Sequence, residues 1–195
     1  MRTFAAIVMS LILSSVAFAE TAADRHQSNS IAFEAGVRQQ SGTTDITSST
    51  AKSQMGYQIG GTVLIPINTL AFRSGLFYVN RPIQLSADDG SGSSTLSFTS
   101  FDVPLQLAYH LDDYSHVYGG VVLSMNVGAD ASNSGSYTTK ITGTTSMMVP
   151  VQIGAAFKFA PGIGADFFFE TMSGNVADHV SAFRSVGVNL LFTFD

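Results

Sequence analysis

Eight segments in which apolar and polar side chains alternate, each of about ten residues, constrain the fold of this chain more than any other feature. The clearest segment runs from Phe101 to Leu111, with an apolar side chain at every second position. The segments begin near Ile31, Tyr57, Leu70, Phe101, Val117, Met147, Ala165 and Val186. Because successive side chains of a β-strand point to opposite faces, this period predicts half-buried strands. The sequence therefore predicts an all-β chain.

The connections between these segments alternate in length. Tight turns are expected at 66–69, 112–115 and 161–164, and longer polar loops at 41–54, 84–94, 130–146 and 173–183. In an up-and-down antiparallel barrel, alternate connections lie at opposite ends, so one end carries all the short turns. The pattern predicts an eight-stranded antiparallel up-and-down β-barrel. The Ser, Thr, Gly and Asn content of the longer connections favours solvated surface loops.

Charged side chains fall on one face of the predicted strands. The apolar face carries no Asp, Glu, Lys or Arg, whereas the opposite face carries Glu34, Arg38, Arg73, Asp102, Lys158, Asp166 and Glu170. A Lys or Arg that faces lipid at the bilayer midplane costs roughly 2–4 kcal/mol, so a lipid-facing surface excludes charge in this way. A soluble ligand carrier would show the reverse arrangement. The placement of charge predicts a transmembrane β-barrel.

These seven charged residues would then face the lumen. The interior of an eight-stranded barrel is only just wide enough for its own side chains. Paired charges in such a space predict a packed polar network that plugs the lumen. The alternative is that the charges are solvated independently in a narrow wet lumen.

The N-terminal residues have the pattern of an export signal. Arg2 precedes an apolar run, and Ala17 and Ala19 form a small-residue cleavage pattern. We expect a signal peptide over residues 1–19, a short polar leader over 20–29 and the barrel domain over 30–195. Export through a cleaved signal peptide follows from this division.

The strand Phe101-Asp102-Val103-Pro104-Leu105 and the last alternating segment carry a resemblance to a known family. The chain resembles small eight-stranded outer-membrane β-barrel proteins, of the OmpA/OmpX-like or porin-like β-barrel-domain type. In that family the final strand is read by the outer-membrane insertion machinery, which implies this role for Val186, Val188, Leu190, Phe192 and Phe194. The sequence departs from that signal by ending on Asp195. The resemblance also implies a Gram-negative-type outer membrane, with its lipid and lipopolysaccharide as partners.

Two prolines lie inside predicted strands. Proline lacks an N–H donor and is normally confined to strand edges or bulges. A closed barrel has no edge, so we expect a bulge or an unpaired carbonyl at Pro104 and at Pro150.

Candidate reactive residues are few. His110 and His116 flank a tight turn without a metal-ligand spacing motif, and His179 lies near Ser173, Asp178 and Ser181 without a catalytic signature. The formal net charge of −5 gives no basic footprint for nucleic acid. We therefore predict no catalytic, cofactor or metal site, and no nucleic-acid partner.

The sequence favours a structural or surface-interaction role for a barrel with a plugged lumen, and any surface ligand stays unidentified. The alternative is a narrow pore or conduit for small or hydrophobic solutes. A lipid-modifying outer-membrane enzyme is a weaker hypothesis, because it rests on the Ser, Asp and His residues around 173–181 alone.

Overall fold

A computed structural model describes residues 30–67, 69–135 and 143–194. The signal peptide expected at 1–19, the leader at 20–29 and Asp195 lie outside the described residues. The strands are β1 (Ser30–Thr44), β2 (Ser49–Ile67), β3 (Leu70–Ala87), β4 (Gly92–His110), β5 (Ser115–Gly135), β6 (Met147–Met148), β7 (Val151–Ala160), β8 (Ile163–Thr171), β9 (Asn175–Ala177) and β10 (Val180–Phe194). Within the described part of the chain, no helix is long and apolar enough to cross a membrane.

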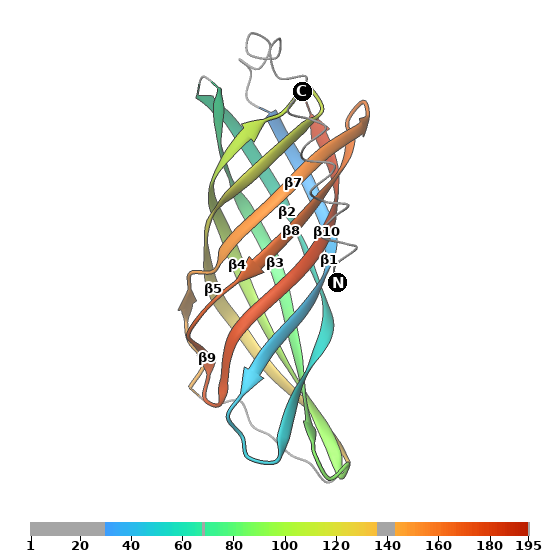
Figure 1. Cartoon of the computed structure of the whole chain (residues 1–195), viewed down its shortest axis with the longest axis vertical. Helices are drawn as coiled ribbons and strands as arrows, with labels where there is room; N and C mark the ends of the chain where they lie inside the picture. The colour runs from blue at the N-terminus through green and yellow to red at the C-terminus, as the bar shows by residue number, and fades with distance from the viewer. Residues whose placement is uncertain (1–29, 68, 136–142, 195) are drawn as a thin grey trace.

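Eight of these strands close into a ring. The hydrogen-bonded order is β1-β2-β3-β4-β5-β7-β8-β10, and β10 pairs back with β1 from Ile31↔Phe194 to Thr44↔Val180. Every pairing is antiparallel, β6 pairs with β5, and β9 pairs with β10. Figure 1 shows the strands crossing the barrel at a steep tilt. The predicted eight-stranded antiparallel barrel is confirmed.

The two ends of the barrel differ, although the difference comes from strand extensions where the sequence predicts longer loops. Short turns join β2 to β3, β4 to β5 and β7 to β8 at one end, where Ser30 and Phe194 also lie. We call this the turn end, and the opposite end, which carries β9, the extended end (Figure 1).

The long polar loops predicted at 41–54 and 84–94 are wrong. The strands continue through them, so β1 and β2 are joined by residues 45–48 alone, and β3 and β4 by residues 88–91. Backbone pairing compensates for the polar composition, because Ser and Thr keep their N–H and C=O groups in the ladder. At the β3–β4 tip, the N–H of Ser91 donates to Asp89 Oδ1 (2.9 Å), and Gly90 takes the positive φ that the turn requires.

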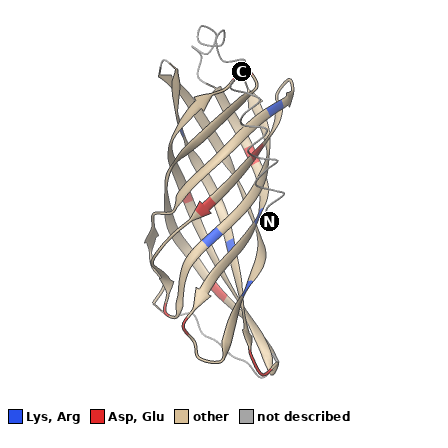
Figure 2. Ribbon diagram, in the orientation of Figure 1, with Lys and Arg blue, Asp and Glu red and all other residues tan. Residues whose placement is uncertain are grey.

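Apolar side chains cover the outer surface of the ring between these ends. The exposed set includes Val37, Ile59, Leu107, Ile153, Phe167 and Val188. Tyr57, Tyr78 and Phe101 lie side by side on β2, β3 and β4, with ring centroids 6.4 and 5.8 Å apart. Aromatic rings in a row on neighbouring strands are typical of the girdle at a membrane interface. In Figure 2 the charged residues occupy few positions along the barrel wall.

The polarity of the strands reverses beyond this girdle. Between these aromatic residues and the turn end, the outward side chains of β3 and β4 are apolar except for Ser74. Towards the extended end the outward side chains are polar except for Pro82, and most of the inward ones become apolar. The inward residues form a buried cluster, which we call the extended-end core: Ile83, Leu85, Leu96, Phe98, Met148, Met172, Val176, Ala177, Val180 and Phe183. The extended end is therefore built like a small water-soluble barrel stacked on a membrane barrel.

Neither internal proline produces a bulge, and an unpaired carbonyl opposite each proline stays a prediction. The β3–β4 register is the same on both sides of Pro104, at Ser74↔Leu105 and Phe77↔Asp102, and the described ladder omits the two positions between. Pro150 separates β6 from β7 without a register shift, and its carbonyl accepts a bond from the N–H of Val122 (2.8 Å). Each missing proline N–H interrupts the ladder locally rather than displacing it.

Candidate functional site

Polar residues that fill the lumen between the turn end and the extended-end core form the candidate site. Three arginines, Arg38 of β1 and Arg73 and Arg81 of β3, are at most 3% exposed. Strand alternation aims all three inward, where a guanidinium without a carboxylate partner would be very unfavourable. Each has at least one such partner.

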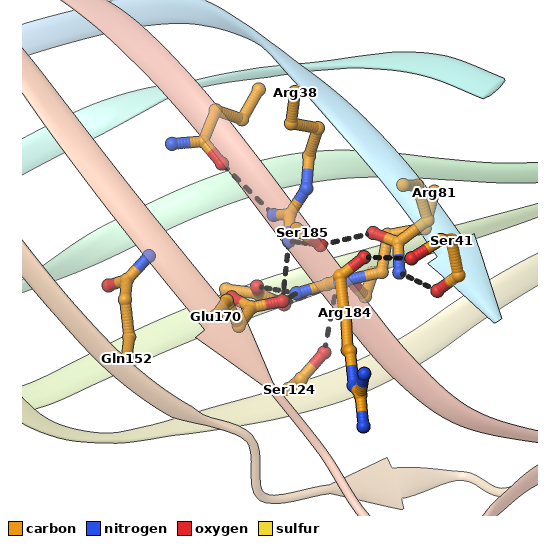
Figure 3. Close-up of polar contacts among 12 residues, drawn as sticks. Arg38, Ser41, Arg81, Ser124, Gln152, Glu170, Arg184 and Ser185 are labelled. Atoms are coloured by element: carbon orange, nitrogen blue, oxygen red, sulfur yellow. Dashed lines mark hydrogen bonds and ion pairs between the residues drawn. The ribbon is translucent and has the colours of Figure 1, made fainter. Parts of the chain in front are cut away.

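Arg38 and Arg81 converge on one carboxylate, Glu170, at the end of β8 (Figure 3). Arg81 also makes a fork with Asp102, with Nη2 donating to Oδ2 at 2.5 Å and Nη1 to Oδ1 at 3.3 Å. Arg38 donates further to Ser185 Oγ (2.7 Å). Glu170 therefore joins β1, β3 and β8 across the lumen.

Arg73 holds a second group of carboxylates nearer the turn end. Its Nη2 donates to Glu34 Oε1 (2.9 Å) and Asp166 Oδ2 (3.1 Å), and its Nη1 donates to Gln106 Oε1 (2.6 Å). The guanidinium lies 4.2 Å from the ring centroid of Tyr118, whose hydroxyl donates to Asp166 Oδ1 (2.7 Å). The cation–π contact and the ion pairs fix this arginine from several strands.

Two amides join these groups into one network. Gln58 accepts a bond from Arg38 Nη1 (3.1 Å) and donates to Asn189 Oδ1 (3.0 Å). Asn189 in turn donates to Glu34 Oε2 (3.0 Å). A continuous chain of hydrogen bonds therefore crosses the lumen from Arg81 to Arg73.

The seven charged residues that the sequence placed on the inner face do not all lie in this network. Glu34, Arg38, Arg73, Asp102, Asp166 and Glu170 are members of it, whereas Lys158 lies in the wall of a cavity at the turn end. Arg81 also belongs to the network, and the sequence does not predict it, because the expected segment that begins near Leu70 is only about ten residues long. Arg81 lies on the same face of β3 as Arg73, because alternate residues of a strand share a face. Continuing this alternation past the end of the predicted segment would have placed Arg81 on the inner face.

Gly154 provides a test of how tightly this site is packed. A Cβ at Gly154 would lie 2.3 Å from the phenol of Tyr118 and 2.7 Å from the backbone oxygen of Phe167. We expect Gly154→Ala to lower the free energy of unfolding by about 1–3 kcal/mol, because Tyr118 must move away from Arg73 and Asp166. Urea unfolding in lipid vesicles, followed by unheated gel mobility, measures the change.

Gly128→Ala is the matched control. The nearest atom to a Cβ there is Thr99 Cβ at 3.8 Å, so the expected change is within about 0.5 kcal/mol. Equal stability of the two alanine variants would contradict the tight packing around Tyr118.

The lumen is open to different degrees along its length. A cavity of about 250 Å³ enters from the turn end and reaches Glu34 and Arg73. Within the network, a second space of about 20 Å³ lies between Arg73 and Glu170, close to the size of a single water molecule. Beyond Arg81 the extended-end core fills the interior with apolar side chains. The free space thus narrows from the turn end towards the extended end.

The three histidines in the described part of the chain lie at the two ends of the barrel. His110 and His116 face each other across the β4–β5 turn, with ring centroids 5.7 Å apart, and both line the turn-end cavity. His179 Nδ1 lies 2.7 Å from Asp45 Oδ1 at an exposed position, and Ser181 Oγ lies 3.0 Å from Thr43 Oγ1. Among the described residues, no group of three His, Cys, Asp or Glu side chains is placed to hold a metal ion.

The residues of the expected insertion signal lie on the outer face of β10. Val186, Val188, Leu190, Phe192 and Phe194 are all between 37% and 66% exposed. Together they form one apolar stripe beside β8 and β1. Recognition by insertion machinery stays a prediction.

Comparison with known proteins gives one family and several similar folds. A family model described as outer membrane protein beta-barrel domain matches residues 22–173. No curated protein matches the sequence. One similar solved structure is that of Ail, the attachment invasion locus protein of Yersinia pestis, in complex with the heparin analogue sucrose octasulfate. The two chains have a TM-score of 0.50 and 11% sequence identity, and the match covers 85% of this chain and 99% of that chain. Neisserial surface protein A has a TM-score of 0.48 and 15% identity, over 84% and 97% of the two chains. OprG of Pseudomonas aeruginosa has a TM-score of 0.44 and 11% identity, over 85% and 95%.

Proposed function

Since this chain belongs to the outer membrane protein beta-barrel domain family, we propose that it is a non-conducting barrel that holds a rigid β-sheet extension at the cell surface. The chain is an outer-membrane β-barrel protein. In such barrels the short turns face the periplasm, so the extended end faces outwards. The role is structural or interactive, with no catalytic step.

The filled lumen is the observation that carries this proposal. An ion crossing the barrel would meet the network around Arg38, Arg73 and Arg81 and then the extended-end core. Passage would require a hydrated ion to separate buried ion pairs and then enter an apolar region, and both steps are unfavourable. Two barriers of different chemistry in series support a closed barrel.

The β-sheet that continues beyond the aromatic girdle supports the proposed role at the cell surface. Beyond the girdle, β3 and β4 continue as a paired ladder up to Ser86↔Ser93, and β4 and β5 up to Gly92↔Gly135. Paired strands present side chains in fixed positions, which lowers the entropy lost when a partner binds.

Single-channel recording tests the closed lumen. The wild-type barrel, reconstituted in planar bilayers, is expected to give no steady conductance, whereas a porin added to the same membrane shows that channels are detected. Different gel mobility of unheated and boiled samples verifies that the barrel is folded, because a closed ladder resists detergent until heated. Steady ion-selective conductance of the folded protein would refute the proposal.

The turn-end cavity favours a second candidate function, a narrow conduit for small or hydrophobic solutes. Its volume of about 250 Å³ has room for a small molecule next to Glu34 and Arg73. A conduit predicts faster solute uptake by cells or vesicles that contain the barrel. A plugged barrel predicts equal rates with and without it.

A further inference from the structure

The inner end of the turn-end cavity, which we call its floor, is formed by Glu34, Thr62 and Arg73. Arg73 is the only arginine in this half of the described network, and it faces two carboxylates, Glu34 and Asp166. In the other half, two arginines face two carboxylates, so those charges balance. The floor therefore has one negative charge that no guanidinium of the described network compensates.

This charge can attract an ion from one side only. The cavity opens at the turn end, whereas the rest of the network and then the extended-end core separate the floor from the opposite end. Lys158 and Asp113 line the cavity near the turns and have opposite charges, so the mouth itself is close to neutral. Because an uncompensated charge inside the barrel is very unfavourable, the floor favours a cation that enters from the periplasm.

Thr62 determines which kind of group can bond at the floor. Its hydroxyl donates to Glu34 Oε1 (2.6 Å), and since a hydroxyl has one hydrogen, Thr62 Oγ1 can only accept a bond from a ligand. Both Nη atoms of Arg73 already donate to side chains of the network. The floor therefore presents an acceptor, which an ammonium group with its three N–H donors can satisfy.

The wall between the mouth and the floor is largely apolar. Its buried apolar members are Ala32, Leu64, Ala71, Ala156 and Leu191. A hydrated metal ion would lose water against this wall, and among the described residues no group of three His, Cys, Asp or Glu side chains is placed to replace that water. Methylene groups gain free energy from the same contact. The volume of about 250 Å³ is below the usual range for drug-sized ligands, about 300–1,000 Å³, so the ligand must be small.

We propose that the turn-end cavity binds a small primary amine in its charged form, with the ammonium group at the floor and a short apolar stem along the wall. The bound amine supplies the positive charge that this half of the network lacks. It enters and leaves by the periplasmic mouth, so binding requires no passage through the barrel.

Methyl NMR of the folded barrel in phospholipid nanodiscs tests the proposal. The probes are butylammonium, butanol and butyrate near neutral pH, which have the same stem and differ in charge. The methyl groups of Leu64 and Ala71 report binding in the cavity, whereas those of Leu107, which is 55% exposed on the outer face, report partition into lipid.

Two variants change the floor in different ways. Thr62→Val removes the accepting hydroxyl and keeps every charge, whereas Glu34→Gln removes the excess charge and leaves Arg73 with one carboxylate. The matched control is Thr99→Val, which removes a hydroxyl from β4 at a residue that does not line the cavity. Unheated gel mobility verifies that each variant is folded.

We expect the wild type and Thr99→Val to bind butylammonium about tenfold more tightly than butanol or butyrate, because hydrogen bonds to charged groups are the stronger ones. Thr62→Val and Glu34→Gln are each expected to lose most of that preference. Should Glu34→Gln fail to fold, Thr62→Val decides alone.

Three results would overturn the proposal: equal binding of the three probes by the wild type, an unchanged preference in the folded floor variants, or shifts at Leu107 without shifts at Ala71. None of these depends on whether the lumen conducts. A conducting barrel that still prefers butylammonium would refute the closed-barrel proposal and leave the amine site standing.

Discussion

Replacing Arg81 by leucine is expected to lower the free energy of unfolding by about 3–5 kcal/mol, because it leaves the buried carboxylate of Asp102 without its guanidinium. Asp102 loses both bonds of its fork, and Glu170 keeps Arg38 alone. Urea unfolding in lipid vesicles measures the loss, with the folded fraction read from unheated gels.

Two further variants show whether the loss comes from the unpaired charge. Arg184→Leu removes an arginine that points away from this cluster in Figure 3, so it is expected to change stability by no more than about 0.5 kcal/mol. Adding Asp102→Asn to Arg81→Leu removes the unpaired carboxylate charge and is expected to restore at least half of the loss. A double variant that is no more stable than Arg81→Leu would show that lost packing, and not charge, dominates.

Truncating Phe98 to alanine is the second change with a large expected effect, again about 3–5 kcal/mol. Phe98 is fully buried in the extended-end core and meets Phe183 of β10 edge to face, with centroids 5.7 Å apart. The substitution leaves a cavity between β4 and β10 that the surrounding ladder cannot collapse to fill. The same urea titration measures it.

Two variants serve as controls for Phe98→Ala: one keeps most of the buried side chain, and the other removes an aromatic ring that is not buried. Phe98→Leu retains most of the buried volume and is expected to cost less than about 1.5 kcal/mol. Tyr114→Ala removes an aromatic ring that is 68% exposed at a turn, with an expected change within about 0.5 kcal/mol. If Phe98→Ala costs no more than Tyr114→Ala, the extended-end core does not stabilise the barrel.

The sequence predicts the membrane part of the fold well because lipid imposes a simple rule. An outward charge is so unfavourable in the bilayer that the lipid-facing rows, which include Ile59 and Val188, are almost entirely apolar. Period-two alternation then gives the strand phase, and the alternation of turn lengths gives the topology.

The same rule fails beyond the bilayer, where the outward face becomes polar. The sequence predicts a loop at Ser93 and no strand at Thr95 or Ser97, although the backbones of all three residues are paired with β3. The inward Leu96 and Phe98 could not be recognised as core, because their phase is that of Asp102 in the membrane part. Composition cannot distinguish a polar loop from a polar outer face.

For the candidate site, the sequence predicts which residues face the lumen but not which of them pair. Alternation within the bilayer puts Glu34, Arg73 and Asp166 on one face, and these side chains do meet. Which carboxylate each arginine binds depends on how the strands stagger around the ring, and a single sequence carries no record of that stagger. The sequence did not predict Arg81 as a member of the network, because this residue lies where the outward face of β3 changes from apolar to polar.

The pairing of β1 with β10 makes assembly of the barrel a cooperative event. Ile31 and Phe194 come from opposite ends of the described chain, so the last ladder to form brings together the most distant segments and carries the largest loss of loop entropy. Until then the sheet has two open edges, and unpaired backbone groups in lipid cost several kcal/mol each. We expect few stable intermediates inside the bilayer, and a chain that lacks β10 loses its closure as well as one strand.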